Sequence, residues 1–170
     1  MKKTTGFYPR PSVDANGKSA VGQAGGVLLT STVRAAGLDV GLSAVLGPWR
    51  PVGATHDPAK VLLDLAITLA LGGDTCSDLA VVRAEPAIFG RVASDPTASR
   101  TIARLAADVD KVLPAIDRAR AAARSRVWAA AGPHAPDHDA GQPLVVDVDA
   151  TLVTAHSPGM STGSWSASGL

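Results

Sequence analysis

Two aspartates and a threonine in the segment Leu144–Val153 (LVVDVDATLV) have the residue types and spacing of a metal site. The apolar, mostly β-branched residues that precede Asp147 predict a buried strand. A buried carboxylate is costly unless it is paired or bound to a cation. Asp147 and Asp149 therefore indicate a divalent metal ion, and the alternative is an edge strand whose two carboxylates face water.

The composition is typical of one globular domain, or of one domain and part of another, in 170 residues. The formal net charge is only +1, so a nucleic-acid surface must come from local clustering of basic residues. The single cysteine, Cys76, excludes an internal disulfide and a cysteine-based zinc site. Neither a signal-peptide pattern nor an apolar run of about 18 residues occurs, so we expect no membrane span and a cytoplasmic location.

Seven segments carry helix signals. Asp57 and Pro58 are typical of an N-cap and a first helical residue. Thr75 and Asp78 have the spacing of a capping box. The segment that begins at Pro58 is apolar except for residues spaced by four, which predicts a helix covered on most sides. The predicted helices cover residues 27–36, 39–46, 58–71, 75–83, 86–93, 97–108 and 110–131.

The predicted helices at 86–93 and 97–108, joined by the turn Ser94–Pro96, form a helix-turn-helix candidate. Polar and basic residue types at the front of a recognition helix reach phosphates and base edges. In the second helix we expect Ile102 and Leu105 to face the core. The candidate DNA-binding residues are Thr97, Ser99, Arg100 and Arg104.

The arginines of the last predicted helix leave two interpretations open, a solvated face or a phosphate-contacting one. They are Arg118, Arg120, Arg124 and Arg126. After this helix, His134 and His138 lie four residues apart near acids, but a proline-rich loop does not hold metal ligands in place. The predicted organisation is a flexible arm at 1–26, a helical DNA-binding domain at 27–132, a linker at 133–143, a strand segment at 144–156 and a disordered tail at 157–170.

Together these segments resemble the DDE transposases of bacterial insertion sequences, in the group numbered thirteen-eighty within the RNase H-like class. The resemblance covers roughly residues 21–157. Its most specific part is the run LALGGD followed by LAVVRAEP and GRVASDPTASR. The other matching stretches are AGLDVGLS and PLVVDVDATLVTAHS.

The resemblance implies that the helices bind the terminal inverted repeats of a transposon and that LVVDVDAT is the first strand of the catalytic domain. In related transposases the first metal-binding acid stands two residues before a threonine. That acid is Asp149 here, followed by Ala150 and Thr151, and Asp147 is the second choice. Two Mg²⁺ ions would activate the attacking water or 3′-hydroxyl and stabilise the leaving oxygen.

A second Asp and a Glu complete this site further along the family's chain, whereas neither residue type follows Asp149 here. We therefore expect a truncated transposase, mainly α, with a multi-helix domain and one β-strand of an RNase H-like catalytic domain. Such a fragment would bind DNA, with a homodimer as one option, and would not catalyse transposition.

Two alternatives remain. One is a freestanding helical DNA-binding regulator. The other rests on the pattern Asp-x-Asp-x-Thr, which also looks like the first motif of haloacid dehalogenase-type phosphatases. There Asp147 would be the nucleophile and Asp149 the general acid/base. Against this second alternative, Ala150 occupies the usual glycine position, and that fold continues with a long α/β chain.

Overall fold

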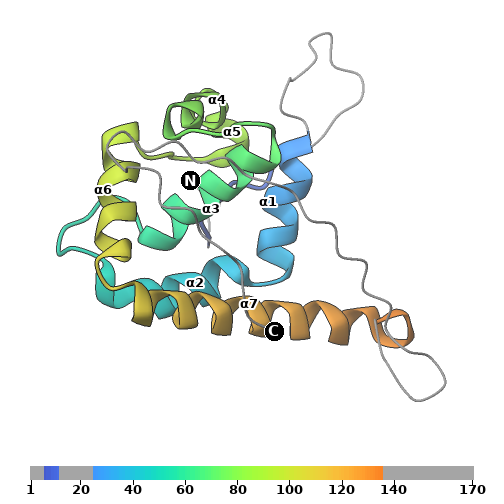
Figure 1. Cartoon of the computed structure of the whole chain (residues 1–170). Helices are drawn as coiled ribbons and strands as arrows, with labels where there is room; N and C mark the ends of the chain where they lie inside the picture. The colour runs from blue at the N-terminus through green and yellow to red at the C-terminus, as the bar shows by residue number, and fades with distance from the viewer. Residues whose placement is uncertain (1–5, 12–24, 136–170) are drawn as a thin grey trace, which may run out of the picture. The chain divides into compact units, whose positions relative to one another are not determined.

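Helices make up most of the computed structural model, which describes residues 6–11 and 25–135. Figure 1 shows α3 in the middle of these helices and α7 extending along one side, and α3 packs against α1, α2, α4 and α6. All described residues belong to the unit Met1–Ala135. The α-helices are α1 (Gly25–Ala35), α2 (Leu38–Leu46), α3 (Pro58–Ala70), α4 (Leu79–Arg83), α5 (Pro86–Phe89), α6 (Asp95–Ala106) and α7 (Val109–Ala131).

Local sequence signals set several of these boundaries. Asp57 Oδ1 accepts a hydrogen bond from the backbone N–H of Ala59 at 2.8 Å, and Pro58 is the first residue of α3. Gly72 follows the end of α3 with a φ of +94°, which favours glycine. The capping box opens the 3-10 turn Cys76–Asp78, which leads into α4, and there the carboxylate of Asp78 accepts from the backbone N–H of Thr75 at 2.9 Å. The predicted N-terminal signals of both helices are therefore confirmed.

The prediction of a β-strand from an RNase H-like domain is wrong, because residues 6–11 and 25–135 contain helices and turns but no strand. The predicted strand segment at 144–156 and the predicted tail at 157–170 lie outside the described residues. A strand needs a neighbouring strand to satisfy its backbone N–H and C=O groups, and the described helices offer none. The mainly α part of the prediction agrees with the structure.

The predicted helix-turn-helix pair also differs from the structure. The helix expected at 86–93 ends at Phe89, so α5 has only four residues. Gly90 follows with a φ of +67°, which turns the chain out of the helix. Instead, α6 is joined to α7 by the short turn Ala107–Asp108. Within the part of the chain that is described, no helix is long and apolar enough to cross a membrane.

Residues 6–11, which we predicted as part of a flexible arm, pack against the helices. The side chain of Tyr8 is fully buried. Arg34 of α1 donates to the carbonyl oxygen of Pro9 at 2.8 Å. A Cβ at Gly90 would lie 3.2 Å from the carbonyl oxygen of Phe7, so the segment also approaches the end of α5 closely. Burial of this aromatic ring stabilises the packing of the segment against the helices.

The contact between α2 and α7 uses one of the α7 arginines. Arg126 donates to the carbonyl oxygen of Ala36 at 2.9 Å. Its guanidinium fills the space beside Gly37, where an added Cβ would lie only 1.5 Å from Arg126 Nη1. Gly37 also has a φ of +66°. Arg126 therefore stabilises the α1–α2 corner.

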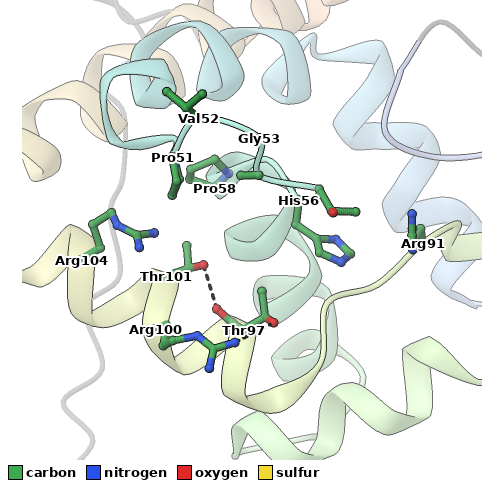
Figure 2. Close-up of a pocket in the computed structure, with 12 residues that line it drawn as sticks. Pro51, Val52, Gly53, His56, Pro58, Arg91, Thr97, Arg100, Thr101 and Arg104 are labelled. Atoms are coloured by element: carbon green, nitrogen blue, oxygen red, sulfur yellow. Dashed lines mark hydrogen bonds between the residues drawn. The ribbon is translucent and has the colours of Figure 1, made fainter.

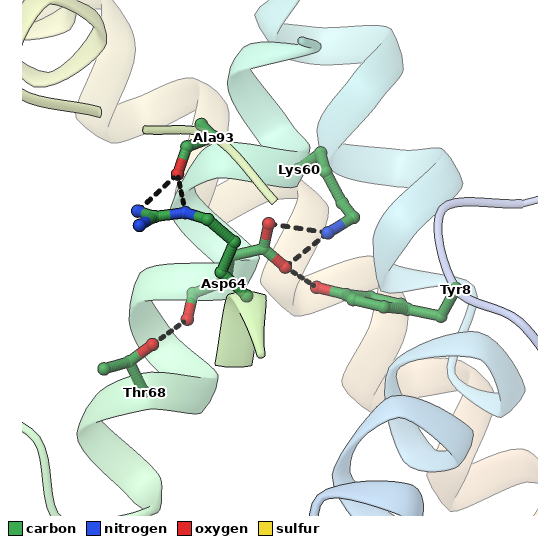
Figure 3. Close-up of polar contacts among 6 residues, drawn as sticks. Tyr8, Lys60, Asp64, Thr68 and Ala93 are labelled. Atoms are coloured by element: carbon green, nitrogen blue, oxygen red, sulfur yellow. Dashed lines mark hydrogen bonds and ion pairs between the residues drawn. The ribbon is translucent and has the colours of Figure 1, made fainter. Parts of the chain in front are cut away.

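The polar residues of α3 form a buried network with Tyr8 (Figure 3). Lys60 Nζ donates to the two carboxylate oxygens of Asp64 at 2.5 and 2.6 Å. The hydroxyl of Tyr8 donates to Asp64 Oδ1 at 3.1 Å, and the ammonium of Lys60 lies 4.5 Å from the centre of the Tyr8 ring. Thr68 donates to the carbonyl oxygen of Asp64 at 2.8 Å. This network attaches residues 6–11 to α3.

Burial dominates the electrostatics of this network. It raises the pKa of Asp64 from 3.8 to about 6, although Lys60 and the Tyr8 hydroxyl act in the opposite direction. Burial also lowers the pKa of Lys60. Because the folded state holds the Asp64 proton more tightly than the unfolded chain, this contribution to stability is complete below pH 3.8 and is lost as the pH rises through about 6.

Replacing only one member of the network should be far more damaging than replacing all three. Lys60→Met leaves the Asp64 carboxylate buried without its cation, and we expect it to lower the free energy of unfolding by about 3–5 kcal/mol at pH 7. The triple variant Tyr8→Phe, Lys60→Met, Asp64→Leu removes every buried polar group of the three side chains, and its free energy of unfolding should stay close to that of the unsubstituted chain. Urea denaturation measures the free energy of unfolding of both variants.

The loss in Lys60→Met should shrink as the pH is lowered from neutral towards 4, because Asp64 then becomes protonated in the folded state. The triple variant, which lacks the carboxyl group, should not show this dependence. Equal destabilisation of the single and triple variants at every pH would contradict the account.

Candidate nucleic-acid interface

A cleft of about 410 Å³ opens between α6 and the loop that leads into α3. Figure 2 shows the side chains that line it. Arg100 and Arg104 come from α6, Arg91 comes from the segment between α5 and α6, and His56 comes from the loop. We call this feature the arginine cleft. Its other lining residues are Pro51, Val52, Gly53, Ala54, Thr55, Pro58, Thr97 and Thr101.

The orientation of α6 follows from its apolar face. Ala98 and Leu105 are buried, and α6 packs on α3 and α7. Thr97, Arg100 and Arg104 are spaced by three and four residues, so they share one side of the helix. That side borders the cleft.

Two contacts fix the start of α6. Arg83 of α4 donates to the carboxylate of Asp95 at 2.6 Å and to the carbonyl oxygen of Ala93 at 3.0 Å. Arg100 Nη2 also donates to Thr97 Oγ1, one turn before it in α6, at 3.4 Å, which is long for a hydrogen bond. The ion pair with Arg83 also neutralises Asp95, the one acid of α6.

The loop on the other side of the cleft is held by its ends. Arg50 donates to Asp57 Oδ2 at 3.3 Å and to the carbonyl oxygen of Ala54 at 3.2 Å. Ser43 of α2 donates to the same carboxylate oxygen of Asp57 at 2.8 Å. Because Asp57 also caps α3, the loop is tied to α2 and α3 together.

The cleft is positively charged. No aspartate or glutamate is among its lining residues. None of Arg91, Arg100 and Arg104 forms an ion pair with a carboxylate of residues 6–11 or 25–135. Burial, and then the positive charges of Arg91 and Lys60, lowers the pKa of His56. Guanidinium groups without carboxylate partners are suited to phosphate, which they bind with several N–H donors.

The structure brings together three of the four predicted DNA-binding residues. Thr97, Arg100 and Arg104 line the cleft, whereas Ser99 is exposed and does not line it. Leu105 faces the core as predicted, but Ile102 is 38% exposed.

Sequence reasoning missed Arg91 and His56. Arg91 was assigned to a helix that ends before it, and His56 lies 41 positions before Thr97, so only tertiary contact brings them to α6. The one available signal was that His56 directly precedes the N-cap Asp57, in a loop between two helices.

The predicted metal-binding acids, Asp149 and the second choice Asp147, lie outside the described residues. Residues 6–11 and 25–135 contain no group of three or more His, Cys, Asp or Glu side chains that could hold a metal ion.

A second, more apolar hollow of about 280 Å³ lies against α7, with Trp128 and Val127 in its lining beside Arg120 and Arg124. Arg120 donates to Asp117 at 3.0 Å. Together with the structural role of Arg126, this pairing makes α7 a weaker candidate for phosphate than the arginine cleft.

The family model described as transposase DDE domain group 1 matches residues 3–162. This range contains the whole arginine cleft and the segment with Asp147 and Asp149. Comparisons with curated proteins and with solved structures gave no match.

The electrostatic coupling inside the cleft can be measured on His56. Arg91→Gln removes the first of the two positive charges that lower the pKa of His56, so we expect that pKa to rise. An NMR titration of the His56 ring protons measures it. Arg118→Gln, the same change on α7, serves as the control and should leave the value unchanged. An identical His56 pKa in all three proteins would contradict the proposed arrangement of charge.

Proposed function

The chain belongs to the transposase family with a DDE domain of group 1, and from this premise we propose that its helical unit binds DNA through the arginine cleft. A transposase-related function follows from the family, and proteins of this kind act on DNA. The observation that carries the proposal is the cluster of three arginines in a cleft with no carboxylate in its lining.

The phosphate backbone of DNA is the ligand that suits this cluster. Arg100 and Arg104 lie one helical turn apart on α6, and Figure 2 shows Arg91 at the opposite end of the cleft from Arg104, so the charges are spread over the cleft. Separated cations match the repeated charges of a nucleic-acid strand better than they match a single small anion. Binding to these arginines displaces counterions from the DNA, which makes the affinity strongly salt-dependent.

We further propose that the DNA is the terminal inverted repeat of a transposon. Phosphate contacts position a protein on DNA, whereas base contacts provide the sequence preference. Thr97 stands in the first turn of α6, and we propose that its hydroxyl contacts a base next to the arginines. Ser99 would contact DNA only if α6 itself entered a groove, because it lies outside the cleft.

The double variant Arg100→Ala, Arg104→Ala should weaken binding to a fluorescein-labelled DNA duplex. Because two phosphate contacts are lost, the slope of log K against log salt should become less steep by about 2. Fluorescence anisotropy over a range of salt concentrations measures both quantities.

The matched control is Arg118→Ala, Arg124→Ala, which removes the same charge from two exposed arginines of α7 that form no ion pair with a carboxylate of the described residues. This control should retain a larger share of the affinity and of the salt slope. Equal losses in the two double variants would show that only net charge matters, and the cleft would then not be the binding site. A duplex with the inverted repeat, compared with one of scrambled sequence, tests the preference for transposon ends.

For the DDE part of the family we propose Asp149 as a metal-binding acid, with Asp147 as the second choice. DDE transposases use divalent metal ions, which carboxylate oxygens bind well. The proposal is supported by the Asp-x-Thr spacing and by the position of Asp149 inside the matched range. The described residues do not include this site, so we derive no catalytic step from it.

Paramagnetic Mn²⁺ offers a test that does not depend on catalysis. In an NMR titration, Mn²⁺ should broaden the backbone signals around Asp149 before those of the helices. Asp149→Asn should remove this effect, and Asp147→Asn should reduce it less. Broadening that is the same in both variants would contradict the assignment.

A freestanding DNA-binding regulator is the second candidate, favoured by the fact that the arginine cleft is built entirely from residues of the helical unit. It predicts the same salt-dependent binding without selective Mn²⁺ broadening near Asp149. Family membership favours the transposase interpretation over the phosphatase alternative.

A further inference from the structure

His56 lies between the arginine cleft and a second hollow. The second hollow has a volume of about 350 Å³, and Thr55, His56 and Arg91 line both. Figure 2 shows the imidazole ring of His56 projecting from the loop towards the side of the cleft that carries Arg91 and Thr97. A ligand that occupies the arginine cleft at Arg91 is therefore within reach of this ring.

The ring of His56 is not engaged by the fold. The side chain is half-buried, and no hydrogen bond joins its ring to another residue of the ranges 6–11 and 25–135. A neutral imidazole has one N–H donor, whereas an imidazolium has two. Protonation of His56 therefore adds both a donor and a positive charge to the cleft.

The surroundings of His56 keep it neutral while the cleft is empty of anions. Burial, and then the charges of Arg91 and Lys60, lowers its pKa below the ordinary value of 6.5. Asp57 is the one carboxylate that lines either hollow, and it already accepts from Ser43 and Arg50. The charged residues that line the two hollows with His56 are Arg50, Asp57, Lys60, Arg91, Arg100 and Arg104.

A phosphate group in the cleft has the opposite effect on the ring. A negative charge close to a histidine favours the protonated form and raises the pKa by about one unit or more. A phosphate bound to Arg91 is close to His56, because Arg91 is already near enough to act on the ring. Phosphate also offers an acceptor oxygen to each of the two side chains. The ring nitrogen takes its proton from solvent, and no other bond changes.

We propose that His56 and Arg91 together hold one backbone phosphate of the DNA, and that His56 takes up a proton as the DNA binds. This inference rests on the proposed function of the arginine cleft and adds a binding residue whose charge depends on pH. Because binding takes up a proton, the affinity should increase as the pH falls through the pKa of His56 in the complex. It should become constant below the pKa of His56 in the free chain.

The direct test is the pKa of His56 in the free chain and in its complex with a DNA duplex of mixed sequence, measured by NMR titration of the ring protons. His134 is the internal control, because it is exposed and lines neither hollow. We expect DNA to raise the pKa of His56 by about one unit or more. The pKa of His134 should change much less.

Fluorescence anisotropy tests the consequence for affinity. His56→Gln keeps an N–H donor but cannot become charged, and His134→Gln is the matched control. At about pH 5.5 the unsubstituted chain and His134→Gln should bind about tenfold more tightly than His56→Gln, with a salt slope steeper by about 1. At about pH 8 the three proteins should bind nearly alike, because His56 is then neutral.

The comparison between variants is needed because Asp64, with a pKa of about 6, titrates in the same range of pH in all three proteins. Thermal unfolding at both pH values checks that each variant stays folded.

Two results would overturn the inference. One is a pKa of His56 that is the same in the free chain and in the complex. The other is a loss of affinity in His56→Gln that is equal at both pH values, because the side chain would then act by its shape and not by its charge. Failure of the proposed function gives a different result, in which Arg100→Ala, Arg104→Ala binds the duplex as well as the unsubstituted chain does.

Discussion

The carboxylate of Asp57 is the constraint on which the geometry of the arginine cleft depends. Oδ1 accepts from the first turn of α3 at 2.8 Å, while Oδ2 accepts from Ser43 of α2 at 2.8 Å and from Arg50 at 3.3 Å. Asp57 is only 9% exposed, so water competes little for these bonds. One side chain thus fixes the start of α3, the end of the loop and the distance of both from α2.

A second hydrogen bond holds the other end of the loop between α2 and α3. The indole Nε1 of Trp49 donates at 3.1 Å to Asp108, which stands in the turn between α6 and α7. The loop wall of the cleft is therefore bonded to the corner of the helix that forms the opposite wall. Lys60, in the buried network of α3, adds its charge to the field that acts on His56. The helix α3 thus carries both the buried network and a charge that acts on the cleft.

The sequence predicted those parts of this arrangement that are local. Asp57 and Pro58 identified the start of α3, and Thr97, Arg100 and Arg104 were predicted together near the start of one helix. It did not predict that Tyr8 would pack into the core, because the surrounding glycines and prolines indicated an arm. The sequence also predicted a helix through residue 93, whereas α5 ends at Phe89 because Gly90 takes a positive φ inside an otherwise helical pattern. Arg91 and His56 join the cleft only through tertiary contacts, which local periodicity does not report. The strand was predicted from an apolar run and from the family resemblance, and the described helices give it no partner.

The most direct test of the central claim, that DNA binds in the arginine cleft, is an NMR titration of the isotope-labelled chain with duplex DNA. The account predicts that the largest backbone shifts fall on residues 51–57, on Arg91 and on residues 97–104, which surround the cleft. Shifts confined to the arginines of α7, with the cleft residues unchanged, would contradict it.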